Sequence, residues 1–402
     1  MTALTADLTG RRLDARRFVS VALVASCVAG LTLTASLGDY PADAGPSIHA
    51  LVSGHVLRAI QLQPLMGSFA VLARLPFALA AALAGGGEVG VYRAGVLPCL
   101  LALGAVGLWL GRRSGLRGAG ALLVPALAVL NPASLDAVRT GHPEEALGAA
   151  LVVAAVLLAD RHPTWSAVLL GLAIATKQWA ILAAVPVVWA APRTVRLRTA
   201  GIAAAVAALL TAPLALGSVT AFSHTGYNAA TAPSASVRAT VWFLVAHPER
   251  LRLHLPAGFP TAATIYVLPA WVGHVSHPLI VLAAPAVGLL VWRRPSRTGD
   301  ALALLALLLL LRCVLDPANN EYYHLPLLLS LLAYETVAKR NVRGLPLATL
   351  SSAAALWLTF DRLDAGGAAP ALTNAVYLTW ACATLVYLLH SLGPRLRPRD
   401  AR

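Results

Sequence analysis

The sequence predicts an all-α, polytopic transmembrane protein, and three observations carry this prediction. The 402 residues are 58% hydrophobic and only 12% charged, whereas a soluble domain carries about 25% charged residues. Apolar runs recur from one end of the chain to the other and leave no room for a separate soluble domain. Arginine clusters fall between these runs, as the positive-inside rule requires.

The charge and the cysteines exclude several other classes. A net charge of +14 would suggest a nucleic-acid partner in a soluble protein. The positive-inside pattern explains the charge here, so we expect no nucleic acid. The four cysteines all lie inside apolar runs, without metal-site spacing: Cys27, Cys99, Cys313 and Cys382. They are typical of small core residues, and we expect neither disulfides nor zinc.

The N-terminal part predicts one crossing followed by a long outer loop. Residues 1–17 form an arginine-rich tail that we place in the cytoplasm. The apolar run Phe18–Leu37, at roughly 20 residues, is long enough to cross a bilayer as an uncleaved helix. The arginines at 112–117 should be cytoplasmic as well, so Val89–Leu110 is the one crossing before them. Residues 38–88 then form the first extracytoplasmic loop.

This first outer loop is expected to contain interfacial helices. Its segment Phe69–Ala84 carries Arg74 between polar breaks, and the crossing count requires it to lie along the outer interface or to re-enter. Gly85–Glu88 is then a turn on the outside.

The later apolar runs predict further crossings up to residue 391. They are Gly118–Leu130, Glu145–Ala159, Trp165–Thr176, Gln178–Ala191, Ala200–Leu216, Pro278–Trp292, Ala301–Leu315, Tyr323–Ala338, Leu345–Phe360 and Ala371–His390. The total is about twelve helices in a single transmembrane domain, residues 18–391, with a cytoplasmic basic tail at 392–402 and both termini cytoplasmic. This topology corresponds to a multi-pass protein of the plasma membrane.

The outer face carries most of the chemically mixed residues. Most of the 17 carboxylates fall outside in this topology, and most of the 31 Lys and Arg residues fall inside. The longest later outer stretch, residues 217–277, is expected to lie on the membrane surface and close a cavity from above. Its histidines are irregularly spaced without a paired carboxylate, so we expect no metal site there. The working face is therefore the extracytoplasmic one.

The stretch from Ser36 to Pro64, directly after the first apolar run, contains the first candidate site. It holds Asp39 and Asp43, followed by two histidines and Arg58. Ionisable groups at the edge of the hydrocarbon usually mark a site. The alternative is that the two aspartates only cap a loop helix, with Asp43 as its N-cap.

The second candidate group lies between the third and fourth expected helices. Its sequence contains Arg139, His142, Glu144 and Glu145, with Pro143 at a first-turn position. Capping and the helix dipole explain two acids at a helix start. They do not explain the arginine and the histidine beside them.

The third group is the tip of a predicted helical hairpin, where Lys177 is followed by Gln178 and Trp179. A lysine at such a tip either extends to water or contacts an anionic headgroup. A compact ammonium is well suited to phosphate.

The fourth group lies between Asp316 and Pro326. A plain connector explains its turn residues, and an aromatic belt explains its tyrosines. His324 lies about one helical turn below Glu321, beside other hydrogen-bonding groups. The candidate residues here are Asn319, Asn320, Glu321, Tyr322, Tyr323 and His324.

Taken together, the acidic first outer loop, the amphipathic segments after it and the polar groups on the outer face resemble the GT-C superfamily of polytopic glycosyltransferases. More narrowly, the chain is similar to the polyprenyl-phosphate-mannose-dependent mannosyltransferases of envelope glycolipids. The Lys-Gln-Trp tip and the Asp-Pro…Tyr-Tyr-His loop resemble their equivalents in that group. Both Asp39 and Asp43 precede Ala50–Gly54, so both remain candidates for the first-loop aspartate. The first outer loop contains no two adjacent acidic residues, such as Asp-Asp or Glu-Asp. We therefore expect no metal cofactor.

The resemblance implies an inverting transfer of a sugar, mannose in the first place, from a polyprenyl-phosphate donor to a lipid or glycan acceptor on the outer leaflet. Asp43 or Asp39 would be the general base. The cations expected to bind the donor phosphate are Lys177, Arg139, His324 and Arg58. The residues expected to bind the sugar or the acceptor are His142, Glu144, Glu145, Gln178, Asn319, Asn320, Glu321, Tyr322 and Tyr323. The lipid-linked donor carries its own activation, so no cofactor is needed.

Two other functions fit the same composition. About twelve helices also suit a transporter or a flippase of lipid or polyprenyl phosphate, although we find no internal repeat and no polar residues at mid-depth. The second alternative is a non-catalytic membrane scaffold. It predicts that substitutions of the polar residues in all the outer loops are harmless.

Overall fold

The computed structural model describes residues 37–64, 66–114, 119–223, 238–252, 262–292, 294–338 and 345–396. The expected first helix, Phe18–Leu37, and the N-terminal tail lie outside these residues, as does most of the C-terminal tail. The described residues form α-helices and short 3₁₀ and π segments, with one two-stranded hairpin. The all-α prediction is thus confirmed apart from that hairpin.

The first half of the chain, up to residue 217, contains only helices among its described residues. They are α2 (Gly45–Val52), α3 (Val56–Gln61), α4 (Ser68–Leu83), α5 (Gly87–Ser114), α6 (Ala119–Leu130), α7 (Pro132–Arg139), α8 (Glu144–Leu158), α9 (Pro163–Ile174), η1 (Gln178–Ala183), α10 (Ala184–Ala190), η2 (Arg193–Val195) and α11 (Arg196–Gly217). The expected turn before α5 is present, since Gly85 and Gly87 adopt positive φ angles of 74° and 59°.

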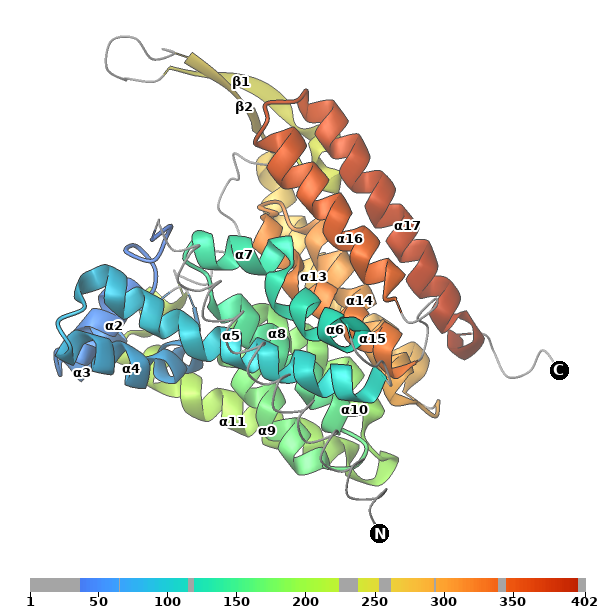
Figure 1. Ribbon diagram of the computed structural model, residues 1–402, viewed down its shortest axis with the longest axis horizontal. Helices are drawn as coiled ribbons and strands as arrows, with labels where there is room; N and C mark the ends of the chain where they lie inside the picture. The colour runs from blue at the N-terminus through green and yellow to red at the C-terminus, as the bar shows by residue number, and fades with distance from the viewer. Residues whose placement is uncertain are drawn as a thin grey trace.

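The second half contains the hairpin and the remaining helices. They are η3 (Val241–Val245), β1 (His247–Arg252), β2 (Ala262–Val267), α13 (Ala270–Val291), α14 (Thr298–Leu315), η4 (Glu321–His324), α15 (Leu325–Val337), α16 (Leu347–Trp357), the π-helical η5 (Leu358–Asp364) and α17 (Pro370–Leu396). In Figure 1, α2–α4 lie together at the lower left of the molecule, α16 and α17 lie on the right, and β1 and β2 lie at the top.

Helix α8 lies at the centre of the helix packing. It contacts α5, α9 and α15, while α14 contacts α15 and α17. Nearly all of its residues are buried, and most of them are alanine or valine. Small residues let helices approach closely: a Cβ on Gly171 of α9 would meet the backbone oxygen of Ala203 in α11 at 2.7 Å. The polar start of α8, at Glu144, is therefore held rigidly inside the protein.

The expected number of about twelve transmembrane helices is too high for what the described residues show. Five segments are long and apolar enough to cross a membrane: Gly87–Ser114, Arg193–Gly217, Ala270–Val291, Thr298–Leu315 and Pro370–Gly393. The other expected crossings that fall within the described residues do contain helices, but these are shorter than the roughly 20 residues that a straight crossing needs. Helix α9, for example, ends after 12 residues, because the polar Thr176–Gln178 break follows it.

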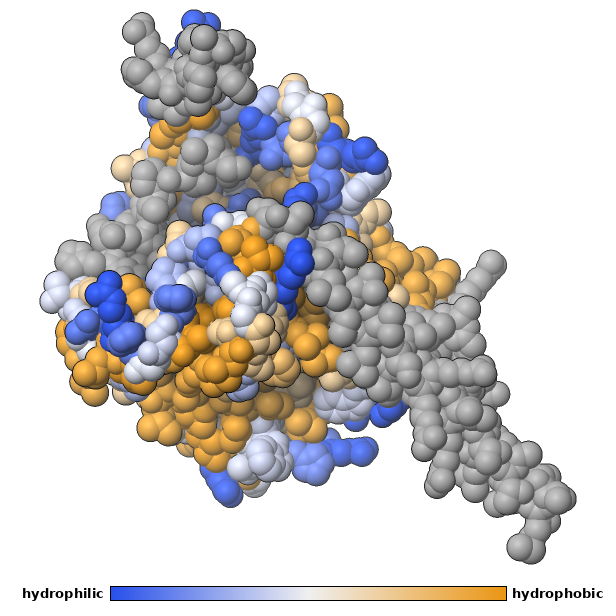
Figure 2. All heavy atoms as spheres, turned by 60° about the vertical axis from the view of Figure 1, so that its left-hand side comes forward, coloured by the Kyte–Doolittle hydropathy of each residue, from blue (hydrophilic) through white to orange (hydrophobic). Residues whose placement is uncertain are grey.

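The outer surface suits a membrane protein. Figure 2 shows a broad apolar face with hydrophilic residues gathered above and below it. Leu209 and Leu216 of α11 and Leu289 of α13 are each more than 70% exposed. An exposed apolar surface of this extent suits contact with lipid. The multiple apolar helices and this surface identify an integral membrane protein.

The segment 217–277 differs from the surface loop expected. Its described part contains the antiparallel pair β1 and β2, with His247 opposite Val267. Helix α13 begins at Ala270 and continues through Pro278, where the helix was expected to start. The β-branched and aromatic residues at 264–267 favour a strand, and this signal was missed.

Candidate functional site

Two loops far apart in sequence interlock and create the site. The Asp39 N–H donates to the Thr140 carbonyl at 2.8 Å. Gly38 and Gly141 both have positive φ angles, 52° and 93°. A Cβ on Gly38 would lie 2.2 Å from the Thr140 carbonyl carbon, and one on Gly141 would lie 2.6 Å from the Tyr40 nitrogen. Only glycine permits this close backbone contact, which brings the first-loop aspartates beside His142.

The His142 imidazole lies among three carboxylates. Its Nε2 is 3.2 Å from Asp39 Oδ2, and its Nδ1 is 3.3 Å from Glu144 Oε1 and 3.8 Å from Asp43 Oδ2. One face of the ring stacks on Tyr322, with centroids 4.5 Å apart. Burial alone would lower the pKa of His142, but the hydrogen bond and charge of Glu144, with help from Asp39, raise it above its usual range. The ring is therefore stabilised as a cation.

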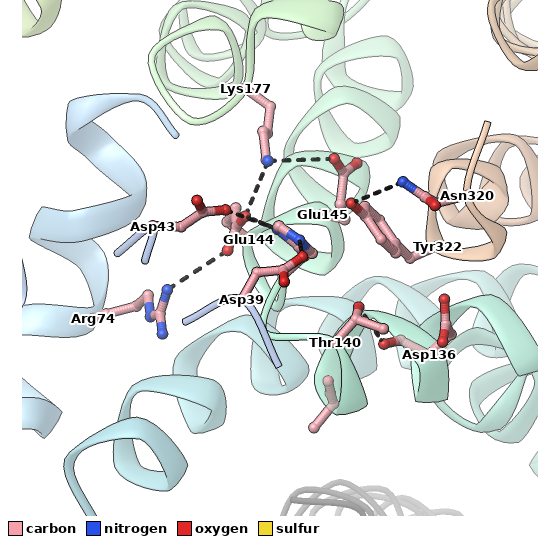
Figure 3. A network of polar contacts seen from close by, with 12 residues as sticks. Asp39, Asp43, Arg74, Asp136, Thr140, Glu144, Glu145, Lys177, Asn320 and Tyr322 are labelled. Atoms are coloured by element: carbon pink, nitrogen blue, oxygen red, sulfur yellow. Dashed lines mark hydrogen bonds and ion pairs between the residues drawn. The ribbon is translucent and has the colours of Figure 1, made fainter. Parts of the chain in front are cut away.

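Glu144, the first residue of α8, connects the histidine to two further cations. Its Oε1 lies 3.0 Å from Lys177 Nζ, and its Oε2 lies 3.5 Å from an Arg74 terminal nitrogen. Glu145 also approaches Lys177, at 3.8 Å. Figure 3 shows these side chains converging from α4, α8 and the loop after α9. The result is a network of alternating charges that is buried except at Asp39, hereafter the ionic cluster: Asp39, Asp43, Arg74, His142, Glu144, Glu145 and Lys177.

Lys177 reaches the cluster because the chain breaks between α9 and η1. Its backbone is extended at this point, and its side chain is 16% exposed. The Gly67 N–H donates to the Thr176 carbonyl at 3.0 Å, which ties this break to the start of α4. Burial lowers the pKa of Lys177, but Glu144 and Glu145 outweigh it, and the pKa rises. Lys177 is thus a fixed cation, and does not simply extend to water.

The two first-loop aspartates occupy different environments. The Asp39 side chain is 69% exposed, whereas that of Asp43 is 10% exposed. Burial raises the pKa of Asp43, against the opposing charges of His142 and Lys177. Helix α2 begins at Gly45 with Ala44 as its N-cap and has no side-chain cap. The alternative that Asp43 caps this helix is therefore wrong.

A cavity of about 230 Å³ adjoins the ionic cluster on the Lys177 side. Its polar lining comprises Glu145, Lys177, Gln178, Arg312, Asp316 and Tyr323, with His277 and Trp179. The Arg312 guanidinium lies over the Tyr323 ring, 4.5 Å from its centroid, and over Trp179 at 5.3 Å. Its apolar lining comprises Ile181, Leu182, Ile280 and Val281. The cavity is thus lined by two cations, Lys177 and Arg312, and by aliphatic side chains.

His324 lies apart from the ionic cluster. Its Nδ1 contacts the Glu321 carbonyl at 3.0 Å, and its Nε2 contacts the Tyr377 hydroxyl at 3.1 Å. Asn319 donates to the same hydroxyl, at 2.9 Å. The rings of Phe360 and Trp380 lie within 6 Å of the His324 ring. Both ring nitrogens are occupied, so this arrangement offers neither to a donor phosphate.

The other candidate cations also lie elsewhere. Arg139 is 57% exposed and pairs with Asp136 at 2.8 Å and with Asp361 at 3.9 Å. Arg58 is exposed on α3. Glu321 is buried, and burial together with the charges of Asp136 and Asp361 raises its pKa to about 8. Neither arginine contacts the ionic cluster. Of the predicted tyrosines, Tyr322 stacks on His142 of the cluster and Tyr323 lines the cavity.

Sequence reasoning missed Arg74 and Arg312 as site residues. Both are single cations inside apolar helices, α4 and α14, and both are buried. An ionisable residue inside an apolar helix is itself a signal of function, and this signal was available. What the sequence did not show was which side of each helix faces the cluster.

The carboxylates of the cluster are paired with cations. Among the described residues, no three His, Cys, Asp or Glu side chains are arranged as metal ligands. The carboxylates, the histidine, the lysine and the cavity together offer a proton acceptor beside a fixed positive charge. This combination suits a reaction in which a hydroxyl attacks and an anionic group departs.

The comparison with known families is consistent with this chemistry. Residues 67–317, more than half of the chain, match glycosyltransferase family 87. This is a family of GT-C type membrane glycosyltransferases that depend on polyprenyl-phosphate-mannose. Membership indicates glycosyltransferase activity. The matched region contains most of the ionic cluster but not Asp39, Asp43 or the Asn319–His324 loop. No curated protein matches the chain. The family match confirms the resemblance: the chain belongs to glycosyltransferase family 87.

Proposed function

We propose that this protein transfers a sugar, mannose in the first place, from a polyprenyl-phosphate donor to an envelope lipid or glycan acceptor at the extracytoplasmic face of the plasma membrane. The transfer inverts the anomeric centre. The observation that carries the proposal is the ionic cluster, in which Asp43 lies 3.8 Å from His142 Nδ1 and Lys177 lies 3.0 Å from Glu144. A general base and a phosphate-binding cation are thereby held in one rigid arrangement.

Asp43 acts as the general base. Its raised pKa makes it a stronger proton acceptor than an exposed aspartate. The acceptor hydroxyl gives its proton to Asp43 while its oxygen bonds to the anomeric carbon. The bond from that carbon to the phosphate oxygen breaks, and the polyprenyl phosphate leaves with the electron pair. The more exposed Asp39 holds the second nitrogen of His142.

The adjoining cavity accommodates the donor. Lys177 and Arg312 bind its phosphate, where negative charge develops as the bond to the sugar breaks. Ile181, Leu182 and Val281 contact the first isoprenoid units of the lipid. Glu145 contributes a carboxylate oxygen that has no hydrogen-bond partner among the described residues, and this oxygen accepts from a sugar hydroxyl.

The test is an assay of purified protein in lipid nanodiscs with polyprenyl-phosphate-mannose and an extract of envelope lipids. We expect a new mannolipid with inverted anomeric configuration, which NMR of the product establishes. Asp43→Asn should lower kcat by about 10²–10⁴-fold, the usual contribution of a general base. Asp39→Asn should lower it much less. A wild-type rate for Asp43→Asn would overturn the assignment of the base.

Two further assays separate the transferase from a flippase. They are needed because the cavity would also suit a lipid phosphate that is moved but not cleaved. Movement of a fluorescent polyprenyl phosphate across proteoliposomes, without any mannosylated product, would support the transporter. Product formation in detergent, where no second leaflet exists, would exclude it as the explanation of activity.

A further inference from the structure

Arg74 is the most deeply buried cation near the site, yet it lines no part of the cavity. It is 0% exposed in the middle of α4. Its guanidinium lies 5.4 Å from the ring centroid of Tyr40 and 5.9 Å from that of Tyr92. Tyr92 in turn donates its hydroxyl hydrogen to the Val138 carbonyl at the end of α7. The arginine is thus fixed between the first outer loop and α5.

The space for this arginine is provided by a glycine. A Cβ on Gly95 of α5 would lie 3.1 Å from Arg74 Nε. This distance is tighter than ordinary van der Waals contact, so a methyl group at residue 95 would press on the Arg74 side chain, which would have to shift by a few tenths of an ångström. The position of the charge therefore depends on this one helical glycine.

Burial of Arg74 is costly for folding. None of its three side-chain nitrogens has a hydrogen-bond partner among the described residues, and a buried charge without hydrogen bonds destabilises the folded state. Its counter-charge is Glu144 Oε2, at 3.5 Å. An apolar side chain between two tyrosines would pack as well without that cost. A fully buried ionisable residue retained in an apolar helix indicates a function.

The function of Arg74 follows from the contacts of Glu144 Oε1, the carboxylate oxygen that Arg74 does not contact. Glu144 Oε1 contacts Lys177 at 3.0 Å and His142 at 3.3 Å. Arg74 approaches Glu144 from the opposite side and touches neither of them, as Figure 3 shows for Arg74 and Lys177. It therefore acts on the reacting groups only through this carboxylate.

We propose that Arg74 is a positioning residue for the transferase: it holds the Glu144 carboxylate in place, so that Glu144 aligns Lys177 with the donor phosphate and His142 with the first-loop aspartates. This inference rests on the proposed function. According to this inference, Arg74 affects the rate of sugar transfer. A residue that only packs in the core would affect stability and not this rate.

The first test replaces the arginine. Arg74→Gln should lower kcat per folded molecule by about 10- to 100-fold, since small misplacements of reacting groups have effects of this size. Arg74→Lys should recover part of the rate. A carboxyl that loses a neighbouring cation binds its proton at higher pH. The acidic side of the pH–rate profile of Arg74→Gln should therefore move to higher pH. The charges still facing Glu144 are then Lys177 and His142, with Asp43 nearby.

The second test moves the arginine without removing it. Gly95→Ala favours the helix in which it lies but pushes against Arg74, so it should fold normally and still transfer more slowly. Gly90→Ala is the matched control: it makes the same change in the same helix, where an added Cβ meets no atom within 4 Å. Arg112→Gln, at the exposed far end of α5, controls for loss of an arginine.

The outcomes separate the two proposals. If wild-type protein forms no glycosylated product, the proposed function fails. If wild-type protein transfers sugar and Gly95→Ala matches Gly90→Ala in rate, the positioning role is excluded. It is also excluded if Arg74→Gln gives less folded protein whose kcat and pH profile equal those of wild type. Should Arg74→Gln not fold at all, the pair of alanine variants decides.

Discussion

The two buried histidines His142 and His324 lie in opposite surroundings. His142 is surrounded by carboxylates and stacks on Tyr322. His324 is surrounded by the rings of Phe360, Tyr377 and Trp380. The charges around the first raise the pKa of His142, whereas burial lowers the pKa of His324 to about 3. The surroundings of His142 favour its cationic form, and those of His324 favour its neutral form.

The contrast shows that burial does not decide what a polar residue does; its neighbours decide. In the ionic cluster, each charge has an opposite charge within 4 Å, which gives groups that can exchange protons or bind an anion. In the aromatic region around His324, neutral hydrogen bonds join His324 and Asn319 to the Tyr377 hydroxyl, which connects η4 to α17. The first region suits chemistry and the second suits stability.

The largest effect on the transfer rate is expected for Lys177, which contacts Glu144 and lines the cavity. Lys177→Met should lower kcat by about 10²–10³-fold, the usual cost of removing one group that stabilises a developing negative charge. Lys177→Arg should retain part of the rate. The assay is sugar transfer by the purified protein, and Arg161→Met, at an exposed turn, is the control. Equal rates for Lys177→Met and the control would remove the ionic cluster from the reaction.

In the aromatic region, Tyr377→Phe should act on stability. It removes the hydroxyl that meets both His324 and Asn319 in the core. Leaving a buried polar group unpaired costs about 1–3 kcal/mol, which thermal unfolding measures. The control is Tyr266→Phe in the hairpin, whose hydroxyl has no hydrogen bond among the described residues. An unchanged melting temperature for Tyr377→Phe would show that these hydrogen bonds do not hold η4.

The pH dependence of stability should separate the two histidines. His142 has a raised pKa when folded, so its stabilisation is present below the unfolded value of about 6.5 and is lost as the pH rises through the folded value. His324 has a lowered pKa, so it destabilises the protein as the pH falls below about 6.5.

Between pH 7 and pH 5, His324→Phe should therefore lose less melting temperature than wild type, and His142→Phe should lose more. Differences of a few degrees are expected. The reverse order would contradict the charge assigned to each ring.

The smallest effect on the transfer rate is expected for Arg139, which sequence reasoning placed at the donor phosphate. It forms an ion pair in which Arg139 is 57% exposed but Asp136 only 8% exposed, and leaving a buried polar group without its partner costs about 1–3 kcal/mol. Arg139→Gln should change the free energy of unfolding by no more than this, and its transfer rate should fall far less than that of Lys177→Met. A loss of rate as large as that of Lys177→Met would place Arg139 at the substrate after all.

The positions of most helices could be predicted from hydrophobic runs. The run expected at Ala301–Leu315 became α14, Thr298–Leu315, and the run at Ala200–Leu216 became α11, Arg196–Gly217. Apolar runs of this kind determine where a helix forms because every backbone group must be satisfied inside lipid. They do not determine how many helices cross, since short runs such as α8 can be buried by neighbouring helices instead.

The candidate site was predicted only in part. Asp39, Asp43, His142, Glu144 and Lys177 were singled out because ionisable groups are expensive in an apolar chain, and the structure brings them together. The local alternatives of capping or of extending to water were not decidable from sequence. Each depends on partners supplied by distant segments.

The sequence by itself determined that this is a helical membrane protein and which residue types are available for chemistry, because composition and spacing reflect the free energy of transfer into lipid. Only the tertiary structure decided that the pKa of His142 is raised and that of His324 lowered, that Asp43 is buried and Asp39 exposed, and that Arg74 lies beside Glu144. These properties depend on distances of a few ångströms between segments far apart in the chain, and Coulomb energies and desolvation change steeply over such distances.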